Sequence, residues 1–97
     1  MILSLISELL SACKVDGQSP AVLLLEAHLD TVEVDGMTIA PFQPTIQDGR
    51  LYGRGSLDTK ATLAVFMHTL ARLAATPKEE RPFPTVVLAA TIDEEHT

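Results

Sequence analysis

Apolar positions near the amino terminus follow a helical period. They fall at i, i+3, i+4, i+7 and i+8, at Ile2, Leu5, Ile6, Leu9 and Leu10. Positions with this spacing lie on one face of an α-helix, so the pattern predicts a packed helix over 2–12. The alternative is a lipoprotein signal cleaved before Cys13, but no Lys or Arg precedes the apolar run and Glu8 interrupts it.

Two later runs are apolar without alternation, at 21–25 and 85–92. Such runs predict strands that are buried on both faces, the first ending near His28. Between them, 59–75 has an apolar stripe at helical spacing and is followed by Pro77, which predicts a long helix. The stripe consists of Leu63, Phe66, Met67, Leu70 and Leu73. A strand, a helix and a second strand in this order predict a parallel βαβ crossover, and therefore an α/β fold.

The connecting segments carry turn signals. Asp48-Gly49 lies between the short runs 45–47 and 50–52, which predicts a small β-hairpin before the long helix. The charged stretch 78–82 predicts a solvated turn. With only two predicted helices, one face of the sheet and two strand edges would stay open to solvent, so we infer a piece of a larger sheet.

Composition narrows the class of protein. The chain has 97 residues, is 46% hydrophobic and 21% charged, and carries a net charge of −6, as one small folded domain would. The acidic balance without Lys/Arg clusters argues against nucleic acid and membrane surfaces as partners. No apolar run reaches the ~20 residues of a membrane span. We therefore expect a soluble, cytoplasmic protein, and its single cysteine means that any metal must be bound by His, Asp and Glu.

Residues of the kind that bind metals follow both predicted strands. His28 and Asp30 come at the end of the first, Glu94 and Glu95 at the end of the second, and Asp58 directly before the long helix. Because ligands of open α/β sheets bind at the carboxyl ends of the strands, we expect these side chains to converge. The Asp30 carboxylate can accept the proton of one ring nitrogen of His28 while the other nitrogen binds a cation.

Each of these residues also has a simpler interpretation. Asp30 could orient a partly buried His28 without any metal, and Asp58 could be a helix N-cap. Glu94 and Glu95 could be solvated residues of a frayed end. Paired carboxylates after a buried strand nevertheless repel each other unless a cation lies between them or one takes a proton.

The order of the motifs is more specific than any one of them. His28-x-Asp30, then Gly53-Arg54-Gly55-x-x-Asp58-x-Lys60, then Asp93-Glu94-Glu95 resembles the catalytic domain of the M20 family of zinc-dependent peptidases and deacylases. That family includes acetylornithine deacetylase, succinyl-diaminopimelate desuccinylase, aminoacylase and the glutamate carboxypeptidases. The resemblance runs from about 22 to 95 and includes Pro41-Phe42 and 48–52.

The resemblance implies a fold and a mechanism. The chain, 1–97, would be part of a three-layer sheet-and-helix catalytic domain of the zinc-exopeptidase kind, without the lid/dimerisation domain and the carboxyl-terminal part. It implies that His28 binds one zinc, Asp58 bridges two, and Glu95 binds the other. Glu94 would be the general base and Asp30 the partner that orients His28. The implied reaction is hydrolysis of an amide bond in a small peptide or N-acyl amino acid, with Co²⁺ or Mn²⁺ as alternative metals and a homodimer as the full-length form.

The chain departs from the family pattern in its ligand count. A further acidic ligand and a late His are missing, which leaves two protein ligands per zinc where three are usual, and Ala61 replaces the usual Gly. We therefore expect little activity from the isolated chain. A second hypothesis is a non-catalytic pseudoenzyme or fragment that packs on a full-length relative through its uncovered sheet. A third is a fragment that is lipid-anchored through Cys13.

Overall fold

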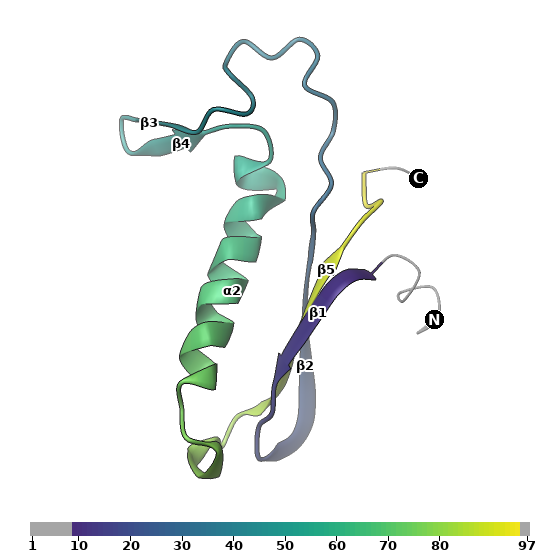
Figure 1. Ribbon diagram of the computed structural model, residues 1–97, viewed down its shortest axis with the longest axis vertical. Coiled ribbons are helices and arrows are strands. Elements are labelled where there is room, and N and C mark those ends of the chain that lie inside the picture. The colour runs from purple at the N-terminus through teal and green to yellow at the C-terminus, as the bar shows by residue number, and fades with distance from the viewer. Residues whose placement is uncertain (1–8, 96–97) are drawn as a thin grey trace.

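A three-stranded sheet organises the chain in the computed structural model, which describes residues 9–95 (Figure 1). Its strands are β1 (Leu9–Val15), β2 (Ser19–His28) and β5 (Pro84–Thr91), in the spatial order β1-β5-β2. β5 pairs antiparallel with β1 and parallel with β2. The predicted parallel crossover is therefore confirmed, and the chain is an α/β protein.

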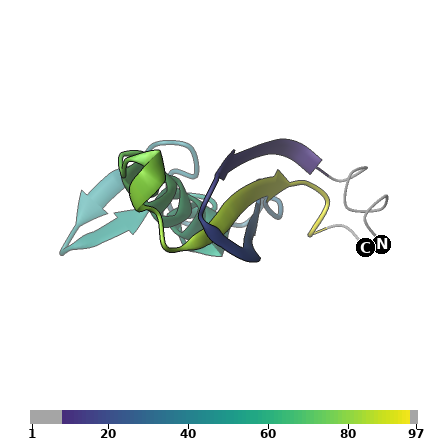
Figure 2. The same cartoon turned by 90° about the horizontal axis from the view of Figure 1, so that it is seen from below.

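The long helix α2 (Ala61–Ala74) makes this crossover and packs on one face of the sheet (Figure 2). A single π-helical turn, Ser56–Lys60, precedes it. The buried cluster between the helix and the sheet consists of Val15, Leu70, Val86 and Leu88, with Leu25, Leu63, Phe66, Leu73 and Phe83 against it. The predicted stripe thus forms the core apart from Met67, which is 56% exposed. Within residues 9–95, no helix has the length and apolar character needed to cross a membrane.

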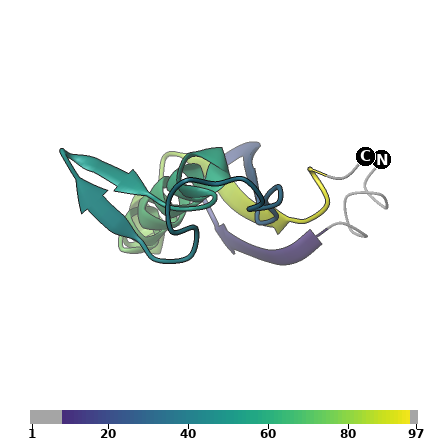
Figure 3. The same ribbon diagram turned by 90° about the horizontal axis from the view of Figure 1, so that it is seen from above.

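The predicted hairpin is present as β3 (Thr45–Gln47) and β4 (Arg50–Tyr52). Asp48 and Gly49, which join the two strands, have φ of 54° and 75°. Positive φ at both central residues is the conformation that fits a two-residue hairpin. The hairpin lies on the far side of α2 from the sheet (Figure 3).

The helix predicted over 2–12 is wrong where the structure describes it. Leu9 pairs with Thr91 and Cys13 with Leu88, so this part of the chain is strand β1; residues 2–8 lie outside the described residues. The helical spacing of the apolar residues is a local property. The backbone groups of β1 are instead satisfied by a strand more than 70 residues further along the chain, which a local period does not register.

The prediction that 21–25 is buried on both faces is also wrong. Val22, Leu23 and Leu24 are 66%, 48% and 51% exposed. They belong to β2, which lies at an edge of the sheet, and no helix in the described range covers the face opposite α2. The central strand β5 matches its prediction, because Val86 and Leu88 on the face toward α2 and Ala89 and Thr91 on the other face are all buried.

Arg81 corrects the prediction of a solvated turn over 78–82. The segment begins with a 3₁₀ turn, Lys78–Glu80, but the Arg81 side chain that follows is buried. Its guanidinium donates to the carbonyl oxygens of Thr76 at 2.9 Å, Asp16 at 3.0 Å and Ala74 at 3.2 Å. Arg81 therefore ties the end of α2 to the turn between β1 and β2.

Candidate metal centre

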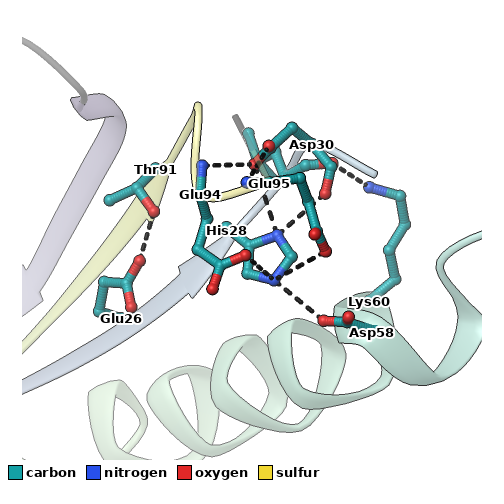
Figure 4. Close-up of polar contacts among 9 residues, drawn as sticks. Glu26, His28, Asp30, Asp58, Lys60, Thr91, Glu94 and Glu95 are labelled. Atoms are coloured by element: carbon teal, nitrogen blue, oxygen red, sulfur yellow. Dashed lines mark hydrogen bonds and ion pairs between the residues drawn. The ribbon is translucent and has the colours of Figure 1, made fainter. Parts of the chain in front are cut away.

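Three segments meet at the carboxyl ends of the parallel strands. His28, the last residue of β2, is paired in register with Thr91, the last residue of β5. The Leu29 amide donates to the Thr91 carbonyl at 2.7 Å, which keeps the two strand ends together beyond the sheet. The π-helical turn before α2 brings Asp58 to the same place (Figure 4).

One imidazole nitrogen faces three carboxylates. His28 Nε2 lies 3.0 Å from Asp58 Oδ1, 3.5 Å from Glu94 Oε2 and 4.0 Å from Glu95 Oε1. His28 is 8% exposed, whereas the Asp58 side chain is 71% exposed and open to solvent. The structure therefore brings together all the acidic residues that were expected to converge on His28 (Figure 4).

Asp30 contacts this group in two ways. Its backbone carbonyl lies 2.9 Å from His28 Nδ1, and its carboxylate oxygen Oδ1 lies 3.4 Å from the same nitrogen. A proton on Nδ1 that is donated to this carbonyl leaves the lone pair of Nε2 directed at the carboxylates. The Asp30 carboxylate also accepts the backbone N–H groups of Glu94 at 3.3 Å and Glu95 at 2.9 Å. Sequence reasoning missed the contact of the Asp30 carboxylate with these two N–H groups, which holds the segment after β5 against the end of β2.

The N-cap interpretation of Asp58 is wrong. The residue before α2 is Lys60, and no side chain caps this end of the helix. Asp58 has φ of −116° and ψ of 86°, which are not helical values. Its carboxylate therefore points at His28 Nε2 instead of at the first backbone N–H groups of the helix.

The crowding of acidic groups around His28 changes the pKa values of this imidazole and of two carboxyl groups beside it. Burial lowers the pKa of His28, but hydrogen bonds to the Asp30 carbonyl and to Asp58, with the charge of Glu94, outweigh it and raise the pKa overall. Partial removal from water, followed by the nearby charges of Asp58 and Glu94, raises the pKa of Glu95. The Asp30 pKa is lowered, chiefly by the N–H of Glu95. These carboxylates thus favour a positive charge at their centre, supplied by a proton or by a metal ion.

The donor set fits a divalent metal ion. Ligand atoms of His28, Asp58 and Glu95 all lie within 4.8 Å of one another. Three protein ligands with a position left for water or substrate are the usual arrangement of a catalytic zinc. Counting along the sequence gave two ligands per zinc, whereas the geometry places all three residues around one point. Imidazole and carboxylate donors also suit Co²⁺ and Mn²⁺.

Fold and site together define an α/β domain with a candidate metal centre at the carboxyl ends of its parallel strands. Residues 24–97 match the sequence profile of the family described as Peptidase family M20/M25/M40. The chain belongs to this family, which confirms the resemblance seen in its motifs.

Curated relatives carry one recurrent description. The chain is 35% identical over 82 residues to the succinyl-diaminopimelate desuccinylase of Aromatoleum aromaticum, covering 81% of this chain and 21% of that protein. It is 41% identical over 86 residues to the enzyme of the same name in Acidovorax ebreus, with the same coverage. It is 39% identical over 84 residues to a probable succinyl-diaminopimelate desuccinylase of Staphylococcus aureus, covering 81% of this chain and 20% of that protein. The chain thus spans about a fifth of the length of these relatives.

Proposed function

We propose that the protein supplies the metal-binding part of a metal-dependent amide hydrolase, as a partial M20-type catalytic domain over 1–97. The main support for this proposal is that His28, Asp58 and Glu95 lie around one point, with Glu94 beside it. The substrate class is an N-acyl amino acid or a small peptide. Among these, the names of the relatives favour an N-succinyl amide as the first compound to test.

In this proposal the three ligands have distinct places. His28 ends β2 and Glu95 follows β5, and Asp58, the most exposed of the three, is the proposed bridge to a second ion. Zinc bound there would acidify a water molecule and polarise the scissile carbonyl. Co²⁺ and Mn²⁺ are the alternatives, and a homodimer is the proposed form of a full-length protein.

Glu94 is the proposed general base and acid. Its Oε2 lies 3.5 Å from His28 Nε2, so the carboxylate lies beside the ligand atoms, and its side chain is 56% exposed and open to solvent. A carboxylate there takes a proton from the attacking water and returns it to the nitrogen of the leaving amine. Asp30 supports this role, because its carboxylate holds the backbone N–H of Glu94.

Zinc titration tests the ligand set. We expect the chain to bind zinc by isothermal titration calorimetry, and Glu95→Gln to weaken binding by about tenfold or more because a charged ligand is lost. Glu79→Gln, the same change at an exposed residue in the 3₁₀ turn, should leave the affinity unchanged. Equal affinities of the wild-type and Glu95→Gln chains would remove Glu95 from the site.

Hydrolysis tests the reaction. With zinc present, N-succinyl and N-acetyl amino acids should be cleaved slowly by the chain, which spans about a fifth of the length of its curated relatives. Glu94→Gln should abolish this rate and leave the zinc affinity nearly intact, since Glu94 is proposed to move protons and not to bind the ion. A chain that binds no zinc and shows no rate that depends on Glu94 is not this hydrolase.

A non-catalytic role is the second candidate, and the exposed apolar residues of β2 favour it. Val22, Leu23 and Leu24 are about half exposed or more, which is unusual for consecutive residues of an apolar strand. In this role the open sheet packs on a full-length member of the same family. Sedimentation of the chain mixed with such an enzyme should show a complex, and separate sedimentation of the two proteins would reject this role.

A further inference from the structure

We propose that Lys60 is a positioning residue of the metal centre, which sets the separation of His28 and Asp58 by holding the carbonyl oxygen of Leu29. The inference rests on the proposed metal-binding function. Nothing in the ligand set itself requires Lys60, since an ammonium group does not bind a cation. Its place in the structure is what points to the role.

The ammonium group of Lys60 reaches the loop between two site residues. Its Nζ donates to the Leu29 carbonyl at 2.9 Å, and Leu29 lies between His28 and Asp30 in the sequence. The amide of Leu29 is bound on its other side to the Thr91 carbonyl of β5. Both backbone groups of Leu29 are therefore held, one by the sheet and one by the helix start.

The other end of Lys60 is part of the turn that carries Asp58. The backbone N–H of Lys60 donates to the Gly55 carbonyl at 2.8 Å, which closes the π-helical turn around Asp58. The side chain thus forms a direct link between this turn and the end of β2. The His28 Nε2 to Asp58 Oδ1 distance of 3.0 Å spans the same two segments.

Gly55 lies beside the path of this link. A Cβ at Gly55 would lie 3.5 Å and 3.6 Å from Cγ and Cε of Lys60, and only 2.9 Å from Cγ2 of Thr31. The lysine stem therefore runs closely along the turn toward the loop 29–31.

Charge and position predict opposite effects when Lys60 is replaced. An ammonium group near the site repels a divalent cation, so removing it should tighten zinc binding if charge alone matters. If Lys60 positions the ligands, its removal should weaken binding, because partners that orient metal ligands typically change affinity by about 10- to 100-fold. The sign of the change therefore decides between the two.

The test compares Lys60→Met, Lys60→Arg and Lys14→Met in the full chain. Lys14 is 64% exposed and paired with Asp16, so its variant removes the same charge without touching the centre. We expect Lys60→Met to weaken zinc binding about tenfold or more and to change the visible spectrum of bound Co²⁺. Lys60→Arg, which keeps a donor for the Leu29 carbonyl, should restore most of both, and Lys14→Met should change neither. Unchanged or tighter binding in Lys60→Met overturns the proposal.

A readout that needs no metal separates this inference from the proposed function. Lys60→Met should shift the NMR signals of the Leu29 carbonyl carbon and the His28 ring, while circular dichroism shows that the fold is retained. If the wild-type chain binds no zinc, the proposed function fails. Shifts at both groups would still support the link through Lys60, and an unchanged His28 ring would overturn it.

Discussion

The pH dependence of zinc affinity follows from the proton affinities at the candidate centre. In the proposed centre zinc would compete with a proton for His28, so the apparent affinity should fall as pH drops below the pKa of this residue. An imidazole at its usual value of 6.5 loses about tenfold in affinity from about pH 7.5 to about pH 5.5. Because the His28 pKa is raised, the loss should exceed about tenfold, and the raised pKa of Glu95 should steepen it further at lower pH.

Calorimetric zinc titrations at several pH values measure this loss directly. In Glu94→Gln, which removes one of the charges that raise the His28 pKa, the loss over the same range should be smaller. A loss well below about tenfold in the wild-type chain would refute the reasoning, because His28 would then not exchange its proton for the metal.

The stability of the chain should respond to pH with opposite signs with and without zinc. A raised pKa means that protonated His28 stabilises the fold below about pH 6.5, and this contribution is lost as pH rises through the pKa in the fold. With a chelator present, urea titrations should therefore give a lower free energy of unfolding at about pH 8 than at about pH 6, because the contribution of protonated His28 is lost. With zinc in excess the order should reverse, because the metal binds the deprotonated ligands and stabilises only the folded chain. The same order in both conditions would contradict this linkage.

Two substitutions test the supporting structure. Gly55→Ala should weaken zinc binding more than Gly36→Ala, because only the Gly55 variant crowds a neighbour near the site. Both glycines have positive φ, 77° and 81°, so each substitution should cost about 1–2 kcal/mol of stability. Equal zinc affinities of the two variants would contradict this reasoning. Arg81→Met should lower the free energy of unfolding by about 3 kcal/mol or more in urea titrations, because three carbonyl groups lose a charged donor. Arg72→Met, an exposed change on α2, should cost no more than about 1 kcal/mol, and an equal cost at Arg81 would contradict the role of its contacts.

Elements with a strong local signal could be predicted from the sequence. The hairpin follows from Asp48-Gly49, whose two positive φ values suit the turn, and α2 follows from its apolar stripe. β1 could not be predicted, because its strand form depends on pairing with β5, far away in the sequence. The burial of Arg81 was missed for a similar reason, since one of its acceptors, the Asp16 carbonyl, lies 65 residues away along the chain.

Residue types at the strand ends were enough to predict which side chains gather at the site. The parallel pairing of β2 with β5 places His28 beside the residues after Thr91, so their approach follows from the topology. Contacts through the backbone were beyond sequence reasoning. Neither the hold of Asp30 on the Glu94–Glu95 segment nor that of Lys60 on Leu29 has a signature in residue spacing.

The position of β5 determines when the sheet can form during synthesis. Among the described strands it is the last along the chain but the central one in the sheet, so β1 and β2 lack this shared partner until Pro84–Thr91 has left the ribosome. Because chains emerge from the amino terminus at about 5–20 residues per second, the two outer strands wait for several seconds with their backbone groups unpaired. A nascent chain that ends before β5 is therefore a substrate for chaperones and proteases. Glu95 emerges later still, so the proposed metal centre gains this ligand only after the residues of all three described strands have been made.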